Sequence, residues 1–119
     1  MEMVKVKVVR DSNNHPLSVE VKGHAFYAPG GSDIVCAAVS ILTQTVLFAL
    51  EDLLGLKTPA MVREGYLLIT SPVEIEQEKE EKYYLLLETM LLGLKETARS
   101  YPRHILYVEK KTSSHGCKR

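Results

Sequence analysis

The sequence predicts an α+β fold in which two helices pack on one face of a largely antiparallel sheet. Short segments of alternating polar and apolar residues indicate strands, and two long segments with apolar residues every three or four positions indicate helices. Their order is strand, strand, helix, strand, strand, helix, strand, which is typical of a two-layer sandwich. The chain of 119 residues suits one domain with its own core. We expect this domain over residues 1–109 and a polar tail over residues 110–119.

The first two strands are predicted to form a hairpin. Residues Met3 to Arg10 alternate valine with polar side chains, and Leu17 to Lys22 alternate again. Between them, Asp11 to Asn14 form a cluster of turn-forming residues, and Pro16 follows. Two alternating segments joined by so short a turn favour antiparallel pairing.

A long helix is predicted from Ile34 to Leu54. Ser32 or Asp33 supplies its N-cap, and Gly55 is a natural stop. The segment is apolar on nearly every side, which predicts a position inside the core. Because polar residues interrupt it, we interpret it as a buried helix and expect no contact with a membrane.

The second half of the chain repeats the pattern of hairpin and helix. Met61–Val62 and Tyr66–Thr70 indicate two strands, and Ile105–Val108 indicates a last one. The second helix is predicted from Glu74 to Ser100. Its inward face is expected to hold Tyr83, Leu87, Met90, Leu94, Ala98 and Tyr101.

Composition excludes some functions and favours a cytoplasmic location. Lys plus Arg equals Asp plus Glu at 15 each, so we expect no direct contact with nucleic acid. The N-terminus lacks the apolar segment of a signal peptide. In the cytoplasm, Cys36 and Cys117 are expected to be reduced. His115 and Cys117 do not make a metal site by themselves, and we expect neither a metal nor a cofactor.

The segment from Gly23 to Ser40 has the residue types needed for nucleophilic catalysis. His24 ends a predicted strand, and Cys36 lies in the first turn of the predicted helix. A helix N-terminus lowers the pKa of a thiol, and a nearby histidine can accept its proton. The unpaired N–H groups of that turn can also hold an oxyanion. The alternative is that Cys36 is a small buried filler and His24 a structural histidine.

Four further features of this segment have two interpretations each. Asp33 is either a plain helix cap or a cap that also orients His24. Ser40 lies one turn after Cys36, and its hydroxyl either bonds back to its own helix or donates beneath the thiolate. Phe26 and Tyr27 either cover an apolar peptide or pack onto the sheet. Gly30 and Gly31 either form a plain turn or let a substrate backbone approach closely.

This segment resembles the ribosomal-processing cysteine protease family of bacteria. The family is marked by Gly-His at a strand end and Asp-Ile-Val-Cys-Ala-Ala-x-Ser at a helix start. Gly23-His24 and Asp33 to Ser40 match both motifs, and the cysteine lies twelve positions after the histidine, as in the family. The likeness continues in Leu87 to Leu94 and in Tyr101-Pro102, so it covers nearly the whole chain.

The resemblance implies a Cys–His endopeptidase that works as a homodimer. Such an enzyme removes a short N-terminal extension from a large-subunit ribosomal protein during ribosome maturation. Carried over, Cys36 is the nucleophile, His24 is the general base, and the loop between them closes over the substrate. The apolar segment from Phe26 to Pro29 and the tail after Lys110 depart from the family pattern. Two other functions remain open: a non-catalytic ribosome-assembly or ribosome-binding module, and a redox-sensing thiol protein.

Overall fold

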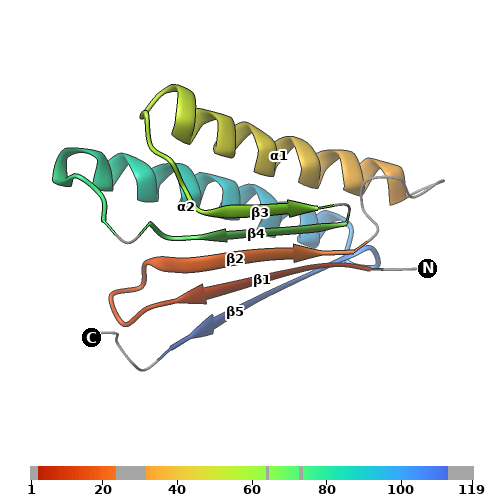
Figure 1. The fold of residues 1–119 in the computed structure, drawn as a ribbon. Coiled ribbons are helices and arrows are strands. Elements are labelled where there is room, and N and C mark those ends of the chain that lie inside the picture. Colours follow the sequence, from red (N-terminus) through yellow and green to blue (C-terminus); the bar gives the residue numbers. More distant parts are fainter. Residues whose placement is uncertain (1–2, 24–31, 64, 73, 113–119) are drawn as a thin grey trace.

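A computed structural model describes residues 3–23, 32–63, 65–72 and 74–112 of the chain. These residues form a two-layer structure with helices on one side and strands on the other (Figure 1). In chain order, the elements are β1 (Val4–Arg10), β2 (Pro16–Lys22), α1 (Ser32–Asp52), β3 (Ala60–Arg63), β4 (Tyr66–Thr70), α2 (Gln77–Ser100) and β5 (Ile105–Lys111). The predicted order of elements is therefore confirmed.

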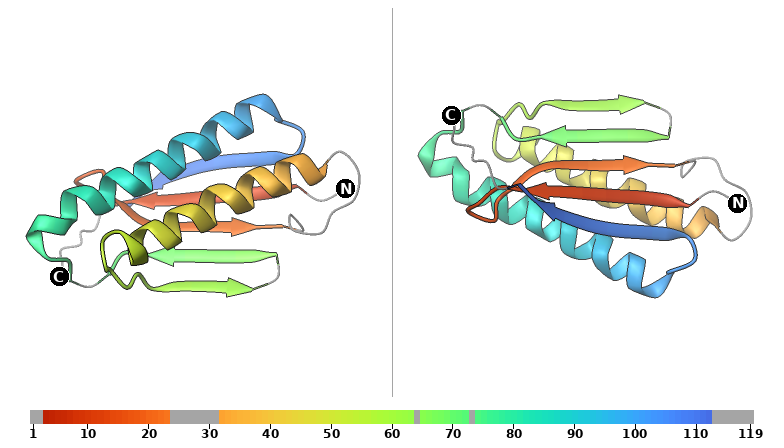
Figure 2. Two further views of the ribbon diagram at one scale, coloured as in Figure 1. Left: turned by 90° about the horizontal axis from the view of Figure 1, so that it is seen from above. Right: turned by 90° about the horizontal axis from the view of Figure 1, so that it is seen from below.

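The described strands form one five-stranded sheet in the order β3-β4-β2-β1-β5. All neighbours pair antiparallel except β1 and β5, which are parallel because α2 carries the chain back across the sheet. Both helices cover the same face, and the view from below shows the opposite face bare (Figure 2). This confirms the predicted α+β class with two helices on one face.

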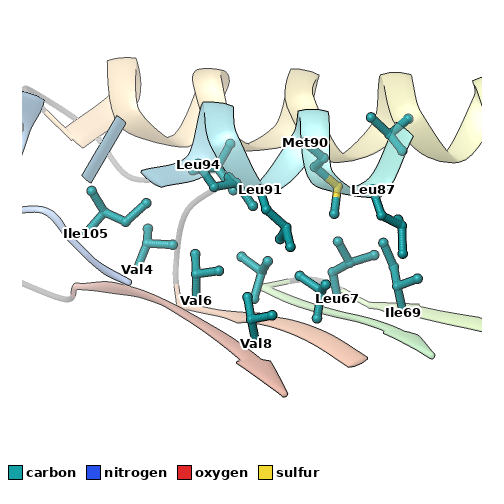
Figure 3. Packing of buried hydrophobic residues seen from close by; sticks show 14 of the residues in the cluster. Val4, Val6, Val8, Leu67, Ile69, Leu87, Met90, Leu91, Leu94 and Ile105 are labelled. Carbon is teal, nitrogen blue, oxygen red and sulfur yellow. The ribbon is translucent and has the colours of Figure 1, made fainter. Parts of the chain in front are cut away.

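The core lies between α2, α1 and the covered face of the sheet. Alternate residues of β1 point to the helices, and Val4, Val6 and Val8 are all buried. From α2, Leu87, Met90 and Leu94 point toward them (Figure 3). The helix and strand periods of the sequence thus place apolar side chains on one shared interior.

Close contact between the two helices depends on Gly93. A Cβ atom added there would lie 2.8 Å from Cδ2 of Leu42, a distance that real Cβ contacts almost never show. Leu42 of α1 therefore occupies the space that a larger residue at position 93 would need. The two helices lie side by side above the sheet (Figure 2).

The structure corrects the prediction that α1 is buried on nearly every side. Val35, Val39 and Leu50 are buried, but Ile34, Ile41 and Phe48 on the other side are between 59% and 65% exposed. By length and composition Ile34–Asp52 could cross a membrane, a test that core helices also pass. A two-layer fold covers only one side of each helix, so an apolar outer side of α1 stays uncovered.

Several element boundaries differ from the prediction. α1 covers Ser32–Asp52 and not Ile34 to Leu54, so Ser32 and Asp33 lie inside the helix and neither is its N-cap. β5 runs to Lys111, two residues into the predicted tail, because Val9 and Arg10 pair with Lys110 and Lys111. α2 begins at Gln77 and not at Glu74. Tyr101 follows the end of α2 and is exposed, so it does not belong to the inward face.

Candidate active site

Cys36 lies near the start of α1 and is buried. It is the fifth residue of α1, which begins at Ser32. Cys36 therefore lies just after the first turn, whereas the sequence predicted a place within that turn. Helical side chains lean toward the N-terminus of their helix, so the thiol lies nearer to the helix start than its backbone does. Only 5% of Cys36 is exposed, and Val35 and Val39 beside it are also buried.

The end of β2 is held in place by Gly23. Its N–H donates to the carbonyl oxygen of Gly65 at 3.0 Å, and its φ of 137° is unfavourable for other residues. An added Cβ at Gly23 would lie 3.0 Å from the Met3 oxygen and from Cα of Val4. The glycine of the Gly-His motif is thus required by the backbone, and it fixes where the chain leaves the sheet before His24.

Gly65, in the turn between β3 and β4, is the other half of this contact. Its φ is 73°, and an added Cβ would lie 2.8 Å from the carbonyl oxygen of Gly23. The sequence places Gly65 between the predicted strands Met61–Val62 and Tyr66–Thr70, but nothing in it showed that this turn touches the end of β2. Contacts between glycines distant in the chain leave no periodic signal, so this residue was missed.

The folding of the chain brings the two ends of the predicted catalytic segment to one end of the molecule. β2 ends at Lys22 and α1 begins at Ser32. Both of these points lie at the same end of the molecule (Figure 1). Because Cys36 is close to the start of α1, its thiol lies at the same end of the molecule as the end of β2, from which the chain continues to His24. This arrangement suits a pair formed by a strand end and a helix start.

Several predicted site residues lie outside the part of the chain that the structure describes. Asp33 has helical backbone within α1, and its side chain is not among the described groups. Ser40 is half-buried one turn after Cys36, and the described residues give its hydroxyl no hydrogen bond. The predicted site residues outside the description are His24, Phe26, Tyr27, Gly30 and Gly31.

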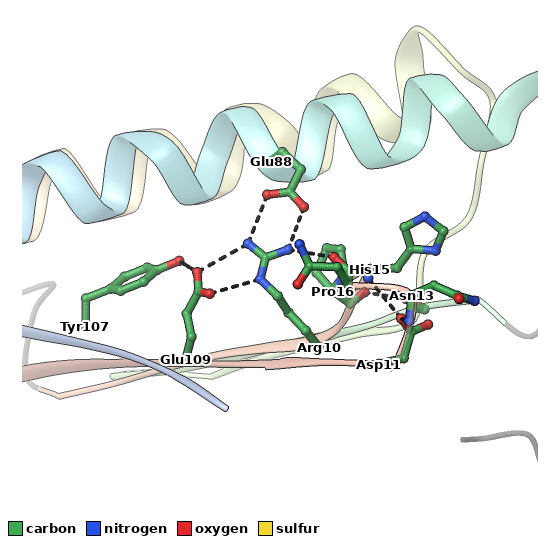
Figure 4. A network of polar contacts seen from close by, with 10 residues as sticks. Arg10, Asp11, Asn13, His15, Pro16, Glu88, Tyr107 and Glu109 are labelled. Atoms are coloured by element: carbon green, nitrogen blue, oxygen red, sulfur yellow. Dashed lines mark hydrogen bonds and ion pairs between the residues drawn. The ribbon is translucent and has the colours of Figure 1, made fainter. Parts of the chain in front are cut away.

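A second polar cluster forms at the opposite end of β1, around Arg10 (Figure 4). Its guanidinium donates to both carboxylate oxygens of Glu88, at 2.6 and 3.0 Å, and to Glu109 at 3.0 Å. The Tyr107 hydroxyl also donates to Glu109, at 2.6 Å. Hydrogen bonds from Arg10 lower the pKa of Glu109, and those to both carboxylates raise the pKa of Arg10.

The Arg10 cluster is a structural cross-link between α2, β1 and β5. Its charges are paired within the cluster, which leaves no reactive group poised for a substrate. The sequence did not predict it, because the partners of Arg10 lie 78 and 99 residues away in the chain. Among the described residues, no group of three or more His, Cys, Asp or Glu side chains could hold a metal ion.

Comparisons with known proteins identify the family of this chain. Residues 3–106 match the family model described as cysteine protease Prp. The ribosomal processing cysteine protease Prp of Bacillus subtilis (strain 168) is 31% identical over 101 residues, covering 83% of this chain and 90% of that protein.

Two solved structures share both the fold and part of the sequence. SMU.848 from Streptococcus mutans superposes with a TM-score of 0.80 and 32% identity, over 92% of this chain and 96% of that one. The Staphylococcus aureus ribosomal processing protease Prp, in complex with a covalently linked product peptide, gives a TM-score of 0.74 and 25% identity. It matches over 91% of this chain and all of that one.

The chain belongs to the Prp family of cysteine proteases. The resemblance found in the motifs around His24 and Cys36 is therefore confirmed at the level of the family. As a cysteine protease the protein is a hydrolase. The alternative of a non-catalytic module is therefore excluded.

Proposed function

We propose that this protease removes a short N-terminal extension from a large-subunit ribosomal protein, with Cys36 as nucleophile and His24 as general base. The observation that carries the proposal is the position of Cys36 near the start of α1, at the edge of the sheet where β2 ends. The Bacillus subtilis relative is a ribosomal processing cysteine protease, which supports the substrate. The Staphylococcus aureus relative carries a covalently linked product peptide, which supports a covalent route.

The reaction proceeds through an acyl-enzyme. His24 accepts the proton of the Cys36 thiol, and the thiolate attacks the carbonyl carbon of the scissile peptide bond. The tetrahedral intermediate collapses, the C–N bond breaks, and His24 gives its proton to the leaving amine. A water molecule then attacks the thioester, again with His24 as base, and the released acid and the thiol complete the cycle.

The start of α1 supplies the electrostatic part of this mechanism. Its first backbone N–H groups have no partner within the helix and carry partial positive charge. They stabilise the oxyanion that develops on the scissile carbonyl. Asp33, in the first turn of α1, supports the site as an orienting partner of His24, and Ser40 lies one turn after Cys36, where its hydroxyl can turn toward the thiolate.

The loop between the two catalytic residues binds the substrate. Phe26 and Tyr27 cover an apolar peptide, and Gly30 with Gly31 lets its backbone approach closely. Closing such a loop excludes water while the acyl-enzyme forms. The enzyme works in the cytoplasm, where a catalytic thiol stays reduced.

The enzyme acts as a homodimer formed through its helical layer. Ile41 and Phe48 are exposed seven residues apart on α1, and Leu85 and Leu92 are exposed seven apart on α2. A seven-residue spacing places side chains on the same side of a helix, two turns apart. Exposed apolar stripes of this kind mark protein–protein interfaces, and a second copy presents the same surface.

The test is cleavage of a peptide that spans the processing site of the host's ribosomal protein, followed by mass spectrometry. The wild-type protein is expected to cut at one bond, while Cys36→Ala and His24→Ala are expected to be inactive. Cys117→Ala is the matched control and keeps the wild-type rate. An unchanged rate in Cys36→Ala would show that another group carries the reaction.

A further inference from the structure

The face of the sheet that carries no helix is strongly basic. Residues of β1 that alternate with the buried valines point to this face, so Lys5 and Lys7 are both exposed there. The register of the sheet places Lys22 opposite Lys5 and Glu20 opposite Lys7. Among the described strand residues, this face holds one carboxylate, Glu20, against five cations: Lys5, Lys7, Lys22, Arg63 and Lys110.

Cations lie in a row that runs across the strands, at the end of the sheet nearest the active site. Strand pairing aligns Lys5 with Lys22, Lys22 with Tyr66, and Tyr66 with Arg63. The Arg63 guanidinium lies 5.4 Å from the centroid of the Tyr66 ring. Lys22 is followed directly by Gly23 and His24, so the row borders the segment that carries the catalytic base.

This row is costly to the fold and is only partly neutralised within it, since the Tyr66 hydroxyl donates to the Glu20 carboxylate at 2.8 Å. Like charges directly opposite each other on neighbouring strands destabilise a sheet, and Lys5 faces Lys22 in this way. Within the described residues no carboxylate pairs with Lys5, Lys7, Lys22 or Lys110. Uncompensated positive charge concentrated on one surface raises the local concentration of anions.

We propose that the bare face of the sheet binds the phosphate backbone of RNA. Neighbouring strands lie about 4.8 Å apart, so the cations of the row can contact several phosphates of one strand together. Tyr66, held beside Arg63, offers a ring on which a base can stack. The proposal rests on the proposed function in one respect: a protease that meets its substrate during ribosome assembly meets it next to RNA.

The net charge of the chain is zero in spite of this basic surface, because acidic residues lie elsewhere in the molecule. Glu74, Glu76, Glu78, Glu80 and Glu81 lie around the start of α2, on the other layer of the molecule. A second copy that offered this acidic segment to the basic face would form a reciprocal dimer, a ring or a filament. A polyanion from outside the chain fits the face without any such assembly.

The experiment measures binding of a fluorescein-labelled single-stranded RNA of about 20 nucleotides by fluorescence anisotropy, over a series of NaCl concentrations. Wild-type protein is expected to bind with a log–log salt slope of about −3, corresponding to about four phosphates. The double variant Lys5→Glu/Lys22→Glu is expected to lose about ten-fold or more in affinity. It keeps a like-charge pair across the strands, so its melting temperature is expected to match that of the wild type.

The matched control is Lys57→Glu/Lys82→Glu, which makes the same change of charge at exposed positions outside the sheet. It is expected to bind RNA within about two-fold of the wild type. Equal losses in both double variants, or no RNA binding by the wild type, would overturn the proposal. So would binding to phosphatidylserine vesicles without binding to RNA, which would assign the face to a membrane surface.

Cleavage of the substrate peptide by the same preparations separates this proposal from the proposed function. Intact cleavage without RNA binding overturns the RNA site alone. RNA binding by a protein that cuts no peptide leaves the basic face in place and overturns the proposed reaction.

Discussion

The proposed catalytic cysteine occupies a position that also belongs to the core. Cys36 is 5% exposed and contributes to the same apolar cluster as Val35 and Val39. Replacement by alanine removes one sulfur atom, whereas serine places a hydroxyl among apolar neighbours. The two inactive variants that are commonly made at such a site are therefore not equivalent in stability.

We expect Cys36→Ala to lower the free energy of unfolding by about 1 kcal/mol, the scale of one buried methylene-sized group. Cys36→Ser is expected to lose about 1–3 kcal/mol, because a hydroxyl costs more than a thiol to remove from water. Urea unfolding at neutral pH measures both. A serine variant as stable as the alanine variant would mean that the pocket of Cys36 offers a hydrogen bond to the hydroxyl.

Gly65 lies against the backbone just before the proposed general base. In Gly65→Ala the new Cβ meets the Gly23 oxygen at 2.8 Å, so either the turn that holds Gly65 or the end of β2 must shift. We expect kcat for peptide cleavage to fall by about ten-fold or more with little change in KM, since misplacement of catalytic groups acts on the chemical step. Steady-state kinetics measures the two constants separately.

Gly55→Ala is the matched control for this substitution. Gly55 also has a positive φ, 62°, but the nearest atom to an added Cβ is Nζ of Lys79, at 3.9 Å. Both variants are expected to lose about 1–2 kcal/mol of stability from backbone strain. An equal fall of kcat in both would assign the effect to stability and not to position.

The contacts of individual residues were also the features that the sequence predicted least well. The Gly-His motif and Cys36 were found because they lie in one short segment with recognisable chemistry. Gly65 and the partners of Arg10 were missed because their contacts join positions far apart in the chain, which periodicity does not report.

At the scale of elements, the Arg10 cluster ties β1, β5 and α2 together. Arg10 is mostly buried, and it meets Glu109 of β5 and Glu88 of α2. Hydrogen bonds from Arg10 lower the pKa of Glu109, so the ionised form of Glu109 stabilises the folded state. This contribution is fully present above the unfolded pKa of about 4.3 and is lost as the pH falls through the lower folded pKa.

We expect Glu109→Gln to lower the free energy of unfolding by about 1–2 kcal/mol at pH 7, the scale of a hydrogen bond to a charged group. The difference from the wild type is expected to shrink as the pH falls below about 4. Urea unfolding at pH 7 and pH 3 measures it. Glu96→Gln is the control, because the ion pair of Glu96 with Arg99 is exposed and is expected to contribute less than about 1 kcal/mol.

Elements were predicted well where one face is buried and the other polar. The strands β1 and β2 alternate cleanly, and α2 has an apolar face that sequence periodicity found, apart from Tyr101. The apolar outer side of α1 gave the wrong expectation of full burial, because an apolar residue facing a partner looks the same in sequence as one facing the core.

At the scale of the whole molecule, the two faces differ in character. The helical layer exposes an apolar stripe, whereas the bare sheet exposes cations together with Met61, Leu106 and Val108. If two copies meet through their helices, both basic faces remain open on the outside of the dimer. The two proposed surfaces are therefore compatible, and one can be tested without disturbing the other.

We expect the double variant Ile41→Glu/Leu92→Glu to be monomeric at concentrations where the wild type is a dimer. Ile41 and Leu92 are exposed, and each is the sequence neighbour of a residue in the contact between Leu42 and Gly93. A carboxylate at each position would be buried without a partner on forming the dimer, which costs several kcal/mol. Sedimentation velocity over a concentration series measures the mass. Met61→Glu is the control, because Met61 is an exposed apolar residue aligned with Leu68 on the bare face of the sheet. A dimer that survives the helix variant but not Met61→Glu would move the interface to the sheet and close the face proposed for RNA.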